Sequence, residues 1–143
     1  MNASKSTGEY MLFFRGADWD QALSTEELQA AMEKIEAWFG KLNQQGKIKG
    51  AQPLGNERKL VFGDQGRIVA DGPFAESKEA IGGYLLVEAD DLEAALAIAK
   101  ASPSLEYGVS IEVRPVLGEC PIRQRLKERA ALSITAGQAL ATA

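Results

Sequence analysis

The fold can be predicted first from residues 10–42, YMLFFRGADWDQALSTEELQAAMEKIEAWFGKL, in which a strand signal precedes a helix signal. Residues 10–14 are apolar at successive positions, which predicts a strand covered on both faces. Ser24 and Glu27 have the spacing of a capping box, which marks the start of a helix. The apolar residues that follow recur at three- and four-residue intervals and form one broad helix face: Leu28, Ala31, Met32, Ile35, Trp38, Phe39 and Leu42. We expect this helix to end near Gly46.

A second strand and helix follow in the same order further along the chain. Residues 84–87 are again apolar on both faces, and Asp90 or Asp91 is suited to cap a helix that ends before Pro103. Residues 110–116 then alternate between apolar and charged side chains, which predicts a last strand with one face exposed.

Between the two units, residues 48–54 form a short extended segment, and residues 59–62 and 67–70 flank a glycine-containing turn typical of a hairpin. The order β-α-β-β-α-β favours an α+β fold, a ferredoxin-like sandwich with both helices on one face of the sheet. Two strands are apolar on both faces, so a monomer would expose an apolar patch on the other face. We therefore expect a homodimer in which the sheets of two copies face each other.

The composition excludes several kinds of chemistry. The 143 residues are enough for one domain, and they include no histidine and a single cysteine, Cys120. Histidine-based catalysis, histidine-containing metal sites, Cys–His pairs and an internal disulfide are thereby excluded. We expect neither a metal site nor a cofactor, and we expect Cys120 to be accessible but inert, because no cation pattern near it predicts a lowered thiol pKa.

The charge is divided unevenly along the chain. Residues 1–118 hold 12 basic and 18 acidic residues, whereas residues 119–143 hold four basic and two acidic residues. The net charge of −4 argues against a partner such as nucleic acid or an anionic membrane. Neither a signal peptide nor a membrane-spanning segment is evident, so a cytoplasmic protein is expected. The predicted organisation is a leader at residues 1–8, a domain at 9–118, and a basic, partly helical extension at 119–143.

A longer motif occupies the centre of the chain. Residues 71–79, DGPFAESKE, followed by residues 81–84, IGGY, resemble the signature of the DGPF, or YCII-related, domain family. The opening YML, the capped STEE segment and the closing IEVRPV also fit, so the resemblance extends over residues 9–117. It implies a small bacterial protein with a dimeric α+β barrel, and the wider superfamily includes lactone isomerases and dehydrochlorinases of aromatic catabolism.

The resemblance also implies where chemistry is to be sought. Members of the YCII type are associated with a His–Asp pair proposed as an active site, but this chain has no histidine to supply it. Asp71 matches the aspartate of the DGPF motif, so only that position is carried over. A mechanism that uses a His–Asp pair cannot be transferred to this chain.

Each candidate site residue has a structural and a functional interpretation. Asp71 either stabilises its Gly-Pro turn or acts as a general base with a pKa raised by burial. Arg15 ends an apolar strand and either forms a surface ion pair or binds a carboxylate. Ser77 and Lys78 lie in a solvated loop or contact a ligand, and the hydroxyl of Tyr84 packs in the sheet or orients that ligand. If the loop is a lid, Gly82-Gly83 is its hinge, and Trp19 lies at the rim of the same cleft.

Three functions follow from these residues. The first is a dimeric module that binds a small polar or anionic molecule in a cleft near the DGPF loop, Arg15 and Asp71. The second is an enzyme of proton-transfer, elimination or isomerase type that uses Asp71 as base without a histidine partner. The third is a partner protein of the transcription machinery that makes contact through the basic extension.

Overall fold

The computed structural model describes residues 6–16, 18–71 and 80–142. Its elements are β1 (Ser6–Arg15), α1 (Thr25–Gln44), β2 (Ile48–Pro53), β3 (Lys59–Phe62), η1 (Asp64–Gly66), β4 (Ile68–Asp71), β5 (Ile81–Glu88), α2 (Leu92–Lys100), η3 (Pro103–Tyr107), β6 (Ser110–Leu117) and α3 (Pro121–Thr142).

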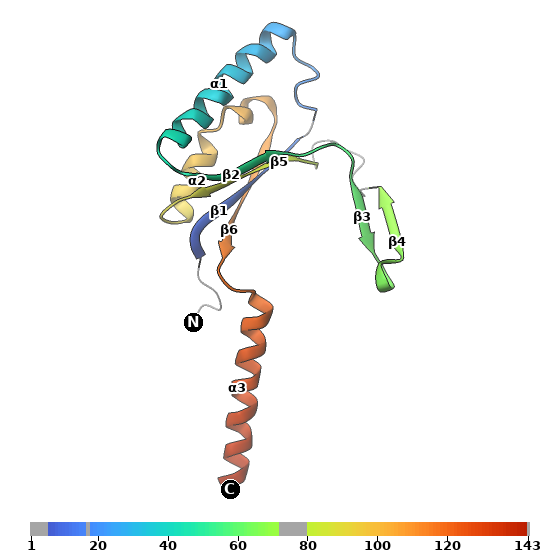
Figure 1. Ribbon diagram of the computed structural model, residues 1–143, viewed down its shortest axis with the longest axis vertical. Coiled ribbons are helices and arrows are strands. Elements are labelled where there is room, and N and C mark those ends of the chain that lie inside the picture. Colours follow the sequence, from blue (N-terminus) through green and yellow to red (C-terminus); the bar gives the residue numbers. More distant parts are fainter. Residues whose placement is uncertain (1–5, 17, 72–79, 143) are drawn as a thin grey trace.

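Four strands form an antiparallel sheet in the order β2-β5-β1-β6, and α1 and α2 cover one face of it (Figure 1). The predicted α+β class and ferredoxin-like arrangement are therefore confirmed. Within the part of the chain that the structure describes, strands β3 and β4 pair only with each other, as the predicted hairpin. This hairpin is inserted between β2 and β5 and projects away from the sheet (Figure 1).

The core lies between the sheet and the two helices. Leu12 of β1 and Leu85 of β5 are directly paired and fully buried, and Trp38 of α1 packs in the same cluster. Burying a leucine side chain contributes about 1.5–3 kcal/mol, so the two central strands and α1 hold the domain together. The predicted inward side chains of β6, Ile111 and Val113, also pack against this cluster.

Both helices begin at the expected caps. The Ser24 hydroxyl accepts a hydrogen bond from the Glu27 N–H at 3.1 Å, and the Ser24 N–H donates to Glu27 Oε1 at 2.9 Å, which completes the capping box. The Asp91 carboxylate accepts from the Ala94 N–H at 2.8 Å at the start of α2. After α1 the chain turns at Gly46, whose φ of +69° lies in the left-handed region that glycine favours.

The face of the sheet opposite the helices is also apolar at its centre. Met11 and Phe13 of β1 and Tyr84 and Leu86 of β5 alternate with the core residues, and all four are half-buried. We refer to these four side chains as the open face. The structure of one copy leaves them facing away from α1 and α2.

The carboxyl-terminal helix α3 extends away from the sheet (Figure 1). Its apolar side chains Ile122, Leu126, Leu132 and Ile134 are all exposed. Within the described part of the chain, no helix combines the length and the apolar character needed to cross a bilayer.

Candidate functional site

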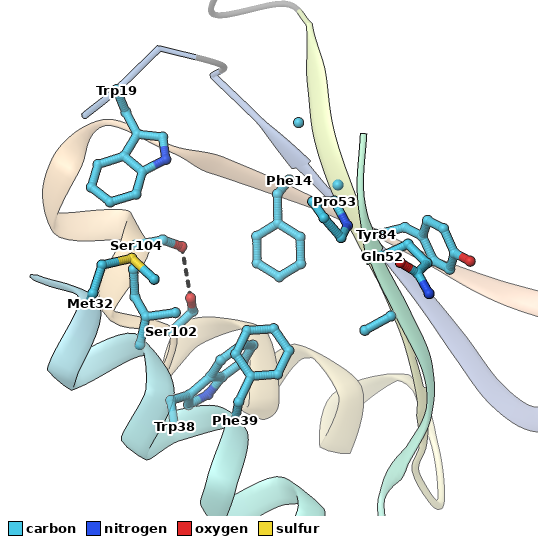
Figure 2. Close-up of a pocket in the computed structure, with 14 residues that line it drawn as sticks. Phe14, Trp19, Met32, Trp38, Phe39, Gln52, Pro53, Tyr84, Ser102 and Ser104 are labelled. Carbon is cyan, nitrogen blue, oxygen red and sulfur yellow. Dashed lines mark hydrogen bonds between the residues drawn. The ribbon is translucent and has the colours of Figure 1, made fainter. Parts of the chain in front are cut away.

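An apolar pocket of about 350 Å³ opens between α1 and one end of the sheet. We name it the aromatic pocket, because its walls are formed largely by Phe14 of β1, Trp38 and Phe39 of α1, and Trp19 from the preceding loop (Figure 2). Met32 of α1 also lines it, which explains why this member of the predicted core face remains 39% exposed. The regular apolar face of α1 thus serves both the core and the pocket.

The rings of the aromatic pocket hold one another in place. Trp38 makes edge-to-face contacts with Phe14, at 6.2 Å between ring centroids, and with Phe39, at 5.1 Å. Such contacts are worth about 0.5–1.5 kcal/mol beyond simple burial, so the flat walls are preorganised for a ring-sized ligand. Trp19 is held separately by Tyr107 of η3, at 5.3 Å.

Two hydroxyl groups are the polar feature of this pocket. Ser102 and Ser104, at the start of η3, are buried, and their oxygens are 2.8 Å apart in a shared hydrogen bond (Figure 2). One hydrogen bond uses only part of the donor and acceptor capacity of two hydroxyls. The pair can therefore accept or donate one further bond to a polar group of a ligand.

A second cavity of about 530 Å³ adjoins this end of the sheet, and we name it the arginine cleft. Arg15 lines it from the end of β1, and Glu57 and Arg58 line it from the segment that leads into the hairpin. Three segments of the chain pass from one cavity to the other. The consecutive pairs are Phe14 and Arg15, Pro53 and Leu54, and Ile81 and Gly82.

Arg15 is fixed in this cleft by an ion pair. Its Nη2 donates to Glu112 Oε1 of β6 at 2.5 Å, and both side chains are about a third exposed. This hydrogen bond lowers the pKa of Glu112, against the smaller opposing effect of desolvation. Glu112 therefore stays ionised and orients the guanidinium group.

The other predicted site residues are Asp71, Ser77, Lys78 and Tyr84. Asp71 is the last residue of β4, and the backbone register sets it opposite Lys59. Lys59 follows Arg58, which lines the arginine cleft. Ser77 and Lys78 lie outside the described residues. Tyr84 contributes to the aromatic pocket, but Figure 2 shows its ring directed away from the other aromatic rings, toward the open face.

With this geometry established, the chain can be compared with known proteins. The family model of the YCII-related domain matches residues 10–118. The chain belongs to the YCII-related domain family. A solved structure similar to this YCII-related chain is the 5-chloro-2-hydroxyhydroquinone dehydrochlorinase of Burkholderia phenoliruptrix AC1100 in complex with 2,5-dihydroxybenzoquinone. The two chains are 14% identical, with a TM-score of 0.42, over 76% of this chain and 92% of the other. No curated protein matches this chain.

Two expectations from the sequence of this YCII-related protein concern Gly82-Gly83 and Cys120. Gly82 and Gly83, the hinge expected if the preceding loop is a lid, both lie within β5, and Gly83 pairs with Phe14 and Pro53, whereas residues 72–79 of that loop lie outside the described residues. A Cβ atom at Gly83 would come within 3.0 Å of the Gln52 carbonyl oxygen, so glycine permits the close approach of β2.

Cys120 also departs from its expected inert state. The N–H groups of Arg123 and Ile122 at the start of α3 lower the pKa of its thiol, with a further contribution from Arg125. These amide groups belong to the first turn of α3, so the position of Cys120 at a helix start lowers the pKa more than the flanking charge does.

The sequence did not identify several residues that line the two cavities. The sequence pattern places Phe14, Trp38 and Phe39 in the core, and it predicts no site role for Ser102, Ser104 or Arg58. The only signal for the serines was their spacing around Pro103 at the end of a helix, which is typical of a turn. Across the described residues, no group of three or more potential metal ligands is present.

Proposed function

We propose that this protein is a homodimeric module that binds a small molecule with an anionic or polar group in the arginine cleft. The observation that carries the proposal is that Arg15 and Arg58, from two separate segments, line the same cavity. Guanidinium groups bind carboxylates through paired, charge-assisted hydrogen bonds. Residues next to Arg15, Leu54 and Ile81 in the chain line the aromatic pocket, so we propose that this pocket supplies apolar walls for the remainder of the ligand beyond the end of the sheet; its volume is at the lower end of the range for small-molecule sites.

The size and shape of the site favour one chemical class. An aromatic or alicyclic ring fits between the flat walls formed by Phe14, Trp38 and Phe39, whereas the carboxylate or phenolate of such a molecule is attracted toward the arginines. A ring hydroxyl can bond to Ser102 or Ser104. We therefore expect ring-containing organic acids rather than nucleotides or extended lipids.

Calorimetry with benzoate as the probe tests this function. Benzoate should bind, and replacing the charged group in Arg58→Gln should weaken its affinity by about tenfold or more. Arg129→Gln is the matched control, because Arg129 is an exposed arginine on α3 and does not line the cleft. Equal affinities of the wild type and the Arg58 variant would exclude the arginine cleft as the anion site.

A second candidate function is proton transfer with Asp71 as the base. The observation that favours it is the backbone register, which sets Asp71 opposite Lys59, the residue that follows the cleft residue Arg58 in the chain. In this reaction the Asp71 carboxylate accepts a proton from a carbon next to the ligand carboxylate, and the carbon keeps the electron pair as an enolate. The arginines stabilise the added negative charge.

Deuterium exchange of phenylacetate, followed by nuclear magnetic resonance, distinguishes the two functions. A proton-transfer enzyme would exchange the methylene protons of this probe, and Asp71→Asn would abolish the exchange without abolishing binding. Binding of phenylacetate with no exchange above the buffer rate would leave the protein as a binding module.

A further inference from the structure

We infer that the β3–β4 hairpin is an arm that packs on a second copy of this chain. The inference deepens the homodimer of the proposed function and rests on it, because it assigns part of the interface to an element outside the ferredoxin-like core. It starts from the exposed apolar surface of the hairpin. Five large apolar side chains are exposed in its eight strand residues: Leu60, Val61, Phe62, Ile68 and Val69.

The arm is apolar on both faces. Val61 and Val69 are directly opposite each other across the two strands and are 61% and 59% exposed. Phe62 and Ile68 form the neighbouring pair, which points to the other face of the ribbon. An isolated two-stranded hairpin is marginally stable in water, so this one needs a surface to pack against.

The chain's own sheet does not provide that surface. The hairpin is a separate two-stranded sheet that projects from the edge of the molecule (Figure 1), and β3 and β4 contact chiefly each other and the turn between them. It follows β2, which is one of the two edge strands of the main sheet. An element attached at an edge can reach past its own sheet to a neighbouring molecule.

The area required for a stable dimer favours a second copy as that neighbour. The open face contributes only four half-buried apolar side chains, Met11, Phe13, Tyr84 and Leu86. A standard interface takes about 20–30 residues from each partner. One face of the four-stranded sheet and the eight residues of the arm together come to roughly that number, whereas the sheet face alone falls short.

Symmetry makes the two surfaces complementary. In a two-fold dimer the same patch is used by both copies, so each arm can cover part of the partner while its own sheet is covered in return. The base of the arm carries Arg58 and Asp71, and Arg58 lines the arginine cleft. Docking of the arm would therefore also fix one wall of the ligand site.

Sedimentation equilibrium of the full chain tests the inference. The most exposed face of the arm is that of Val61 and Val69, which we expect to pack on the partner, and the double variant Val61→Lys/Val69→Glu places an opposite-charge pair there, which preserves the hairpin while removing the apolar side chains of that face. We expect the dimer dissociation constant to rise by about 30-fold or more. The matched control is Leu132→Lys/Ile134→Glu on α3, where two equally exposed apolar side chains are replaced and no change is expected.

Amide hydrogen exchange of the wild type gives a readout that does not depend on a variant. The amides of residues 59–71 should be protected above the dimer dissociation constant and should exchange rapidly below it. A wild-type dimer that the arm variant leaves intact would overturn the arm while keeping the homodimer. A wild type that is monomeric at all concentrations would overturn both the arm and the homodimer, and the arm would then pack on an unrelated protein or on α3. Binding of benzoate tests the ligand site separately.

Discussion

The structure changes the expected ionisation of the Cys120 thiol. Because N–H groups of Arg123 and Ile122 lower the pKa of the thiol below its ordinary value of 9.0, the thiolate is favoured in the folded protein. We expect the rate of alkylation by iodoacetamide to reach half its plateau at a lower pH in the folded protein than in urea. Identical pH profiles in the two conditions would contradict the effect of the helix start.

Ser24 and Glu27 give a second test at single positions. Ser24→Ala removes the hydroxyl that accepts from the Glu27 N–H, and it should lower the free energy of unfolding by about 1 kcal/mol at neutral pH. Ser24→Asp keeps a capping oxygen and should be nearly neutral. Urea denaturation of the three proteins measures both effects.

The capping box also predicts a pH dependence. Hydrogen bonds from Ser24 lower the pKa of Glu27 below its ordinary value of 4.5. Glu27 therefore contributes stability above the unfolded pKa, and this contribution is lost as the pH falls through the lower, folded value. The largest effect on the pKa of Glu27 comes from the backbone N–H of residue 24, which alanine keeps, so both proteins should lose most of this contribution in acid. The difference in unfolding free energy between wild type and Ser24→Ala should therefore narrow only slightly, because the bond from the Glu27 N–H does not depend on the carboxylate charge.

Among the helices and strands, α3 is the element whose removal should lower the free energy of unfolding least. Its apolar side chains are exposed, and its ion pair between Lys127 and Glu119, at 2.6 Å, stays within the extension. We expect a chain ending at Gly118 to lose less than about 0.5 kcal/mol of unfolding free energy at equal protein concentration. A loss of several kcal/mol, or dissociation of the dimer, would show that α3 packs on a second copy.

The elements could be predicted because their signals are local. Ser24 and Asp91 lie at helix starts, and the apolar spacing along α1 identifies the side that faces the sheet. The aromatic pocket could not be predicted in this way. The spacing of apolar residues assigns Met32 and Trp38 to the same helix face. The pocket forms where this face lies against the end of β1, and that contact is visible only in the structure.

Of the two arginines in the candidate site, the sequence predicts Arg15 but not Arg58, because only Arg15 has a local signal. Arg15 was identified because it ends an apolar strand, and the structure does set it in a cleft. Arg58 was missed because its place in that cleft depends on contact between segments more than 40 residues apart in the chain. Sequence spacing carries no information about such contacts, whereas a strand end or a cap is specified within a few residues.

At the scale of the whole molecule, the proposed ligand site is electrostatic and the proposed dimer interface is apolar, so the salt dependence of ligand binding should differ from that of dimerisation. Raising the salt concentration from about 0.05 M to about 0.5 M shortens the screening length severalfold, so benzoate bound to Arg15 and Arg58 should be held several times more weakly. The proposed interface of the arm and the open face is apolar, and each copy carries a net charge of −4. Screening of that repulsion should leave the dimer unchanged or tighten it. Calorimetry and sedimentation on the same samples measure both trends, and a dimer that weakened in parallel with benzoate binding would show that charged groups, not the arm, join the copies.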